Sequence, residues 1–545
     1  MVDCNNNADL SPLPVTVNSC FRCYHSFMLS PIELSLFTSR ISAVCEEMGA
    51  VLRRSALSPN IKDRLDFSCA IFDANGGLCA QAAHIPVHLG SMAYAMADIV
   101  SAIDWCDGDM IVLNDPYLGG THLPDVTVIA PVFYQATLCG FVVNRAHHAD
   151  IGACAPGSMP LSRSLAEEGL LLAPQHLVRA GRVLEDRMAV IAAATGDPIK
   201  TRADFSAQLS ANRAGVNRLL TLLDELGLIG FASALEQLNE YGERLARAAL
   251  ADLPHGVYSY VDFLDDDGVG GVDLAIQLTL TIQNGDVLLD FTGTTGQVAG
   301  NLNCPLSVAA AAAYYVFRCL MPLQTPACAG TFRALRLQAP PGCLVNAQRP
   351  AAVAAGNVET SSRVVDVVLG ALAQAIPERI PAASQGSMNN IAMGVRASSG
   401  NWDYYETIGG GMGAGAHGGG LSAVQTHMTN TLNTPIESLE SQFPLRVRRY
   451  QIRRGSGGAG KRFGGDGLIR EFEFLAPASV TLLTERRRHA PWGMAGGQAG
   501  AVGENRLNEQ PLPGKIALDV VTGDRVTIMT PGGGGWGAAD EANNT

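Results

Sequence analysis

The sequence predicts an α+β fold that mixes helices with several β-hairpins and ends in a glycine-rich part with short strands. Three observations support this prediction. Apolar residues recur at helical spacing in several long stretches. Elsewhere apolar and polar residues alternate on both sides of a turn signal, as they do in β-hairpins. No internal repeat and no long low-complexity linker interrupts the 545 residues, so helices and hairpins share one organisation.

The composition indicates a chain that hides much of its surface. Hydrophobic residues make up 47% and charged residues only 16%, against roughly 25% charge in typical soluble domains. Either the core is large or partner chains cover part of the surface. The net charge of −13 argues against a nucleic-acid binder, which needs a basic face. No apolar run reaches membrane-spanning length, and the candidate at residues 308–317 is short and stopped by Arg318, which favours a buried helix.

The first 29 residues differ from those that follow. They hold an Asn-Asn-Asn run and three cysteines without a clear period, so we expect a disordered extension, or a start codon assigned too early with Met28 as the working start. Cys20, Cys23 and His25 have no second ligand pair at zinc spacing. The 13 cysteines are scattered, odd in number and without a signal peptide, which indicates reduced thiols in the cytoplasm.

From residue 30 the expected elements follow in order. Apolar residues between Ile41 and Leu52 predict a helix over about residues 33–56. Asn75-Gly76 then centres a first hairpin, and a second hairpin turns near residues 135–137. Pro131 in the first strand of that second hairpin indicates an edge or a bulge.

The remainder of the chain again mixes helices and strands. Residues 201–252 hold two helical stretches joined by a short glycine-containing link, which predicts a helical hairpin. Strands are expected over 256–293, 468–475 and 480–483, and helices over 304–322 and 358–377. We therefore divide residues 30–538 into an N-terminal part to about residue 200, the helical hairpin and a mixed α/β remainder, with a short tail at 539–545.

This chain has few charged residues, yet two nearby segments contain closely spaced carboxylates and imidazoles. They are NDPYLGGTHLPDV at 114–126 and NRAHHAD at 144–150. Opposed residues of an antiparallel pair have a constant sum of positions, and a turn centred near Ala136 makes that sum about 272. Asp125 then faces His147 at the open end of the hairpin, with His122 one loop-turn earlier. Two imidazoles and a carboxylate suit zinc, manganese or iron.

Further residues are candidates for support around this site. His148 and Asp150 are near enough to assist the ligands or to transfer a proton. A turn centred near Asn75 in the first hairpin places Asp66 opposite His84, which makes Asp66 a candidate extra ligand or general base.

Structural explanations compete with each functional interpretation. An Asp beside Pro and Gly usually caps a turn, and Asp115 in Asn-Asp-Pro fits that role on sequence grounds. Residues 455–461, GSGGAGK, match most of a phosphate-binding loop, but Arg462 stands where the hydroxyl residue is required and the region is strand-rich. These glycines are better explained by tight turns.

Long segments of the chain resemble the hydantoinase B/oxoprolinase family. They include NIKDRLDFSCAIFD, NDPYLGGTHLPDVTVIAPVF, NRAHHADIGACAPGSMP, THMTNTLNTPIESLE and the closing PGGGGWG, and the resemblance is collinear from about residue 30 to 538. The segment at 414–424 is less acidic than we expect from the family, which leaves substrate specificity open.

The resemblance implies a catalytic subunit of an ATP-dependent cyclic amide hydrolase, of the 5-oxoprolinase or N-methylhydantoinase type. A hydantoinase A-like partner would bind ATP and phosphorylate the amide oxygen, so the working protein would be a hetero-oligomer. Carried over residue by residue, the family's ligands to a divalent metal fall on His122, Asp125 and His147. Metal-activated water would then attack, with Asp66 or His148 taking the proton.

The resemblance leaves other roles open. Arg64, Lys62 or the run Arg486–Arg488 could hold phosphate, although the run is better explained as a solvated or partner-facing surface. An acetone-carboxylase-like subunit would use the same metal to join an activated ketone to carbon dioxide. A non-catalytic scaffold would only stabilise the ATP-binding partner.

Overall fold

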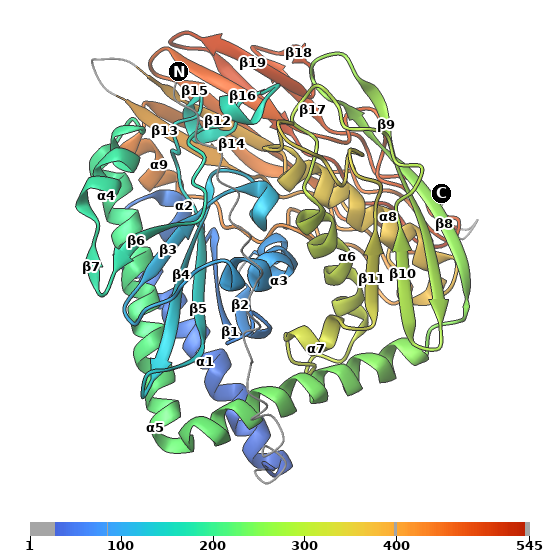
Figure 1. Ribbon diagram of the computed structural model, residues 1–545. Coiled ribbons are helices and arrows are strands. Elements are labelled where there is room, and N and C mark those ends of the chain that lie inside the picture. Colours follow the sequence, from blue (N-terminus) through green and yellow to red (C-terminus); the bar gives the residue numbers. More distant parts are fainter. Residues whose placement is uncertain (1–27, 84, 397–400, 540–545) are drawn as a thin grey trace, which may run out of the picture.

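The structure, a computed structural model, describes residues 28–83, 85–396 and 401–539. These residues form four β-sheets, with helices packed against them (Figure 1). The predicted α+β class is confirmed. The predictions for residues 1–27, including those on Cys20, Cys23 and His25 and on a disordered extension, concern residues outside the described part of the chain. Among these residues no helix is both long and apolar enough to cross a membrane.

A seven-stranded sheet dominates the N-terminal part, with the order β2-β1-β5-β4-β3-β6-β7 and every neighbouring pair antiparallel. Its strands are β1 Phe67–Asp73, β2 Leu78–Ala83, β3 Met110–Leu113, β4 Asp125–Tyr134, β5 Thr137–His147, β6 Gln175–Arg179 and β7 Arg182–Val183. Alternation along β4 sends Val126, Val128 and Ala130 to one face and Ile129 to the other. Both faces are therefore buried.

Helices cover both faces of this sheet. The core on one face contains residues of α1 (Pro31–Ser55) and of the first half of α5 (Pro198–Ala251), and the core on the other contains residues of α3 (Pro86–Ser101). Helix α1 begins at a capping box, because Ser30 accepts from the Glu33 N–H and Glu33 accepts from the Ser30 N–H. The short helices α2 Pro59–Lys62 and α4 Glu185–Ala193 and the 3-10 turns Pro116–Leu118, Pro156–Ser158 and Leu165–Glu167 complete this part.

Helix α5 differs from the predicted helical hairpin. Gly227 bends it with a φ of 67°, but the two arms diverge instead of folding back on each other (Figure 1). The first arm packs along β4 and β5, and the second reaches α7 and β10. The glycine link was therefore recognised correctly, but the direction in which it sends the second arm was wrong.

A second sheet and two buried helices form the middle of the molecule. The sheet order is β11-β10-β9-β8, from β8 Gly256–Asp266, β9 Val272–Gln283, β10 Asp286–Asp290 and β11 Leu335–Gln338. Helices α6 (Leu306–Leu320) and α8 (Ser361–Ala373) supply much of its core. The remaining elements here are α7 Ala329–Phe332, a π-turn at Gly356–Thr360 and a 3-10 turn at Pro377–Arg379.

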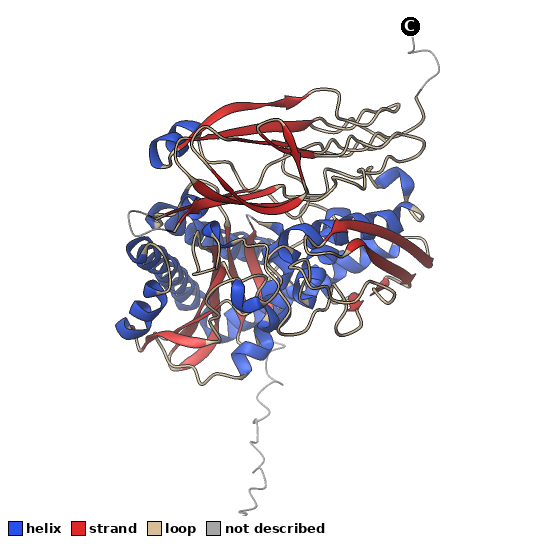
Figure 2. Ribbon diagram, turned by 90° about the horizontal axis from the view of Figure 1, so that it is seen from above, coloured by secondary structure: helices blue, strands red, loops and turns tan. Residues whose placement is uncertain are grey.

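The C-terminal part is a sandwich of two sheets that share one core (Figure 2). One sheet is β13-β12-β16-β19 and the other is β14-β15-β20-β17-β18. The strands are β12 Asn390–Val395, β13 Trp402–Glu406, β14 Leu445–Arg453, β15 Gly467–Phe474, β16 Ala478–Leu483, β17 Glu504–Leu507, β18 Gln510–Leu512, β19 Lys515–Val520 and β20 Arg525–Met529, with one short helix, α9 Ile436–Gln442.

Close backbone contacts explain the glycines of this part. A Cβ on Gly464 would lie 2.0 Å from the Gly533 carbonyl oxygen, and one on Gly457 would lie 2.0 Å from the Gly464 carbonyl oxygen. Residues 455–461 run into strand β15 without a helix after them. Because a phosphate-binding loop needs that helix N-terminus, this segment is not a nucleotide site.

Candidate metal and active site

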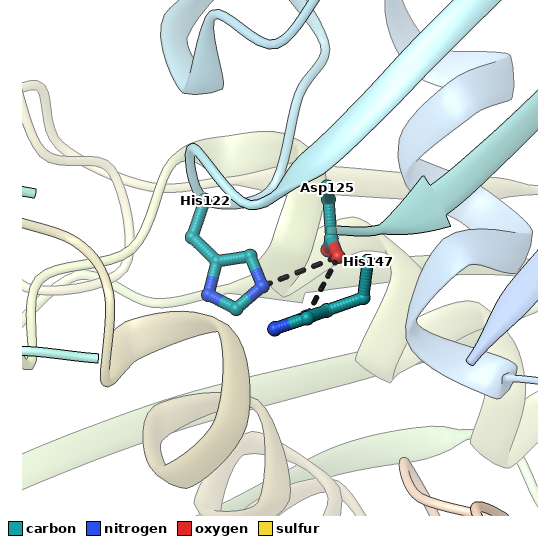
Figure 3. A group of neighbouring side chains, drawn as sticks. All are labelled: His122, Asp125 and His147. Carbon is teal, nitrogen blue, oxygen red and sulfur yellow. Dashed lines mark ion pairs between the residues drawn. The ribbon is translucent and has the colours of Figure 1, made fainter. Parts of the chain in front are cut away.

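The open end of the β4–β5 hairpin brings the two polar segments together. Asp125 pairs with His147, as the sum of 272 predicts, and the chain turns at Gln135 and Ala136. His122 lies three residues before Asp125 in the loop that enters β4. The three side chains point toward one another (Figure 3).

The geometry of this triad fits a single small cation. Asp125 Oδ1 lies 3.2 Å from His122 Nε2 and 3.3 Å from His147 Nδ1. One ligand atom from each residue can be chosen so that all three lie within 4.8 Å of one another. The cavity that the triad lines has a free volume of about 20 Å³, room for roughly one ion or water.

Asp125 is oriented by donors that contact only one of its oxygens. Oδ2 accepts from the Thr121 hydroxyl and from Asn357 Nδ2 at 3.3 Å, and His88 Nε2 lies 3.3 Å from the same oxygen. Oδ1 is buried and accepts no hydrogen bond from the described residues. The carboxylate therefore presents one free oxygen to the cavity.

The imidazoles are oriented in a similar way. His122 Nδ1 lies 3.3 Å from the Ala354 carbonyl oxygen, which can only accept, so Nδ1 carries a proton and Nε2 is the nitrogen that would bind a cation. His122 Nε2 and His147 Nε2 are buried without a hydrogen-bond partner among the described residues. The His147 ring stacks on Tyr405 with centroids 4.9 Å apart. These unpartnered buried atoms are what a bound cation would satisfy.

The electrostatics of the triad agree with this geometry. Burial opposes the charge of Asp125, but His122 and His88 outweigh it and hold the pKa of this carboxyl well below its usual range. Burial likewise opposes protonation of His122, yet Asp125 raises its pKa, whereas burial lowers the pKa of His147. The carboxylate is thus ionised and available as a ligand.

Asp66 reaches the cavity by a different route from the predicted one. A bulge between Ile71 and Phe72 shifts the β1–β2 register by one residue, so Ser68 pairs with Ala83 and Asp66 is not opposite residue 84. His84 itself lies outside the described residues. Strand β1 also pairs with β5, however, which places Asp66 Oδ2 3.9 Å from His147 Nδ1. Asp66 is therefore beside the triad.

Arg64 supports the cavity from behind. Its fully buried guanidinium donates to the Tyr405 carbonyl and to the hydroxyls of Thr407 and Thr431. It also lies over the Tyr405 ring at 4.8 Å from the centroid. Through these contacts Arg64 connects segments that are distant in the sequence, so its guanidinium is not available to bind a phosphate.

Three other predicted residues do not reach the triad. His148 points to the opposite face of β5, because neighbouring strand residues alternate, and hydrogen-bonds to Gln208 of α5 at 2.9 Å. Asp115 caps the turn at Pro116–Leu118 and pairs with Arg349. Asp150 accepts from the N–H groups of Gly152 and Gly196 and pairs with Arg396. Each therefore has a structural role in this arrangement.

The arginine run is not a solvated surface. Arg486 is buried between Asp262 and Asp366, and Arg487 donates to Asn389 and Asn505. Only Arg488 is substantially exposed. The run joins segments of the molecule and offers no phosphate site at the cavity.

Sequence reasoning missed three neighbours of the triad: His88, Asn357 and Tyr405. His88 lies on α3, and the other two lie more than 200 residues from Asp125 in the sequence. No local spacing could reveal them. Only the packing of α3, the π-turn and β13 around the hairpin end brings them in.

Comparison with known proteins identifies the family. The model of the family described as Hydantoinase B/oxoprolinase matches residues 30–539. The chain belongs to this family. An uncharacterized protein of Methanocaldococcus jannaschii is 40% identical, with 94% of this chain and 92% of that protein aligned. The 5-oxoprolinase 1 of Arabidopsis thaliana is 38% identical over 93% of this chain, but this chain spans only 42% of the plant protein.

Solved structures share the whole fold of this hydantoinase B family member. The ATP-dependent caprolactamase of Pseudomonas jessenii superimposes with a TM-score of 0.87 at 27% identity, covering 94% of this chain and 92% of that one. A nucleotide-free acetone carboxylase superimposes with a TM-score of 0.83 at 19% identity, covering 93% and 76%. The second likeness shows the fold alone.

Proposed function

We propose that the chain is the hydrolytic subunit of an ATP-dependent cyclic amide hydrolase of the 5-oxoprolinase or N-methylhydantoinase type. The observation that carries the proposal is the triad of His122, Asp125 and His147, whose unpartnered buried atoms surround a cavity the size of one ion. The names of the relatives, caprolactamase and 5-oxoprolinase, support a lactam as substrate.

The ATP-binding site is proposed to lie on a separate, hydantoinase A-like chain in a cytoplasmic hetero-oligomer. Residues 455–461 do not form a phosphate-binding loop, since extended chain follows them. This chain corresponds to only 42% of the Arabidopsis 5-oxoprolinase, which leaves more than half of that protein for other tasks. ATP binding is our proposal for part of that remainder.

The residues present fit a divalent zinc, manganese or iron ion held by His122, Asp125 and His147. When bound, such an ion lowers the pKa of water toward neutrality. Asp66 lines the cavity, and its Oδ2 lies 3.9 Å from Arg64 Nη2 and 3.9 Å from His147 Nδ1. Its carboxylate is therefore the group we assign to accept the proton of the attacking water.

The proposed reaction starts from a lactam phosphorylated on its oxygen by ATP. One water adds to the amide carbon, its proton goes to Asp66, and the ring nitrogen takes a proton as the carbon–nitrogen bond breaks. A second water then converts the resulting acyl phosphate to carboxylate and inorganic phosphate. The cavity is too small for a lactam, so we propose that residues 85–88 and 429–431 separate when the partner docks.

The test is ATP-dependent release of glutamate from 5-oxoproline, and ring opening of a hydantoin, by this chain combined with its ATP-binding partner. We expect H122A and H147A each to lose at least about 10³-fold in kcat/KM, because water activation is removed. H148Q is the matched control on the other face of β5 and retains activity. Full activity of H122A and H147A would leave only a scaffold role, and dependence on bicarbonate would indicate a carboxylase.

A further inference from the structure

A short segment between β11 and α8, residues 353–357, contacts two members of the triad from outside. The Ala354 carbonyl oxygen lies 3.3 Å from His122 Nδ1, and Asn357 Nδ2 donates to Asp125 Oδ2 at 3.3 Å. The segment is buried and runs into the π-turn at Gly356–Thr360. The orientation of both ligands therefore depends on where this segment lies.

Glu168 holds the segment in place. Its Oε1 accepts the N–H of Val353 at 2.8 Å, the N–H of Ala354 at 2.9 Å and the hydroxyl of Ser162 at 2.7 Å. Glu168 is fully buried and follows the 3-10 turn at Leu165–Glu167. On the far side of the segment, the Gly356 N–H donates to the Asn301 carbonyl at 2.9 Å. Ala354 is thus fixed on its N–H side by one carboxylate.

We propose that Glu168 is a positioning residue that keeps His122 in the Nδ1–H tautomer and aims Nε2 at the bound metal. Glu168 does not contact the triad. It acts through Ala354, whose N–H donates a hydrogen bond to Glu168 and whose carbonyl oxygen accepts one from His122 Nδ1. An imidazole that binds metal through Nε2 must keep its proton on Nδ1, and a fixed carbonyl enforces this state. The inference rests on the proposed metal site.

A purely structural carboxylate offers a matched control. Asp204 is also buried, and its Oδ1 accepts two consecutive backbone N–H groups, from Leu57 at 2.8 Å and Ser58 at 3.1 Å. None of the hydrogen bonds or ion pairs of the described residues joins Asp204 to the triad. D204A therefore removes the same kind of bond without affecting the Ala354 carbonyl that holds His122.

The experiment uses this chain alone with Zn²⁺ or Co²⁺ as the probe. Metal affinity is measured by competition with a chromophoric chelator, the visible spectrum of the Co²⁺ form reports the ligand geometry, and thermal unfolding of the metal-free protein reports stability. We expect E168A to weaken Zn²⁺ binding about 10–100-fold and to change the Co²⁺ spectrum. E168Q keeps an accepting oxygen and stays near the wild-type affinity, and D204A lowers stability only.

Several outcomes would overturn the assignment. Glu168 is only a structural residue if E168A binds Zn²⁺ as tightly as wild type does. The same holds if E168A weakens Zn²⁺ binding no more than D204A does. If E168A does not fold, E168D is used instead, because it shortens the side chain by one methylene and moves the carboxylate away from Ala354. Wild-type Zn²⁺ affinity in E168D would likewise show that Glu168 is only a structural residue. If the wild-type protein binds no metal, the proposed function itself is refuted. If wild type and E168A bind Zn²⁺ with the same affinity, only the role of Glu168 is refuted.

Discussion

Two buried polar clusters of this molecule differ in whether their charges are balanced from within. In the cluster between β8 and α8, Arg486 Nη2 lies 2.7 Å from Asp262 Oδ2 and 2.5 Å from Asp366 Oδ2, and Lys515 Nζ lies 2.5 Å from Glu485 Oε1. In the triad cavity the carboxylate Asp125 faces imidazoles and an amide, and the ligand atoms directed at its centre lack partners.

The difference separates a structural role from a binding role. A buried carboxylate that is paired with a guanidinium has its charge compensated inside the protein. Asp125, by contrast, has imidazoles and neutral donors beside it and no guanidinium or ammonium partner among the described residues, so a cation bound between the ligand atoms would balance its charge. We therefore read the first cluster as a connection between sheets and the second as a site that a ligand completes.

The largest effect is expected from breaking the balanced cluster. R486M leaves Asp262 and Asp366 without this cation, and a buried pair broken on one side costs about 3–5 kcal/mol of folding free energy. Urea unfolding of the metal-free chain measures the loss, and chelator competition should show unchanged Zn²⁺ affinity. A loss below about 1 kcal/mol would mean that the pairs are no more valuable than surface pairs.

A somewhat smaller effect is expected at Glu359, which lies between the two clusters. Its Oε1 accepts from Asn390 Nδ2 at 2.7 Å, and Asn390 in turn accepts from the Tyr405 hydroxyl. Burial, aided by Glu485, raises the pKa of Glu359 to about 7. The folded protein then binds this proton more tightly than the unfolded chain, so this contribution to stability falls as pH rises from about 4.5 to about 7.

E359Q tests this dependence because glutamine cannot ionise. The variant should lose up to about 3 kcal/mol of the pH dependence over that interval, at about 1.4 kcal/mol per pKa unit. Unfolding free energies of wild type and E359Q at both ends of the interval give the comparison. Parallel pH profiles for the two proteins would show that Glu359 titrates normally.

The smallest effect is the gain from completing the triad. Zn²⁺ at about 100 times its dissociation constant should stabilise wild-type protein by about 2.7 kcal/mol, because metal binds only the folded chain tightly. D125A should gain nothing, whereas R486M should gain as much as wild type. Thermal unfolding with and without metal measures this, and stabilisation of D125A equal to that of wild type would place the ion elsewhere.

The site could be predicted only where it depends on one local element. The register of β4–β5 follows from a tight turn at Gln135 and Ala136, so Asp125 and His147 were paired correctly from spacing alone. The same reasoning failed for Asp66 because a bulge in β1–β2 leaves no clear mark in the sequence. Asp66 still reaches the cavity, through pairing of β1 with β5 that a hairpin argument does not consider.

The rest of the site depends on long-range packing. Asn357, Tyr405 and Glu168 come from three separate parts of the chain, and nothing in their local sequence indicates a common destination. Strand alternation does explain why His148, adjacent to a ligand, faces α5 and not the cavity. Helices and strands of the fold followed from periodicity, whereas the bend of α5 did not, because a glycine link predicts a turn but not its angle.

Gly227 sets the angle between the two arms of helix α5. At a φ of 67° any other residue pays a steric penalty of about 1 kcal/mol or more, so a single torsion directs a helical arm of over twenty residues toward the second sheet. A substitution at Gly227 would have to relieve this strain by changing the angle between the two arms of α5. The distance between the seven-stranded sheet and the β8–β11 sheet, and with it the surface offered to a partner, therefore depends on one residue that is not part of the triad.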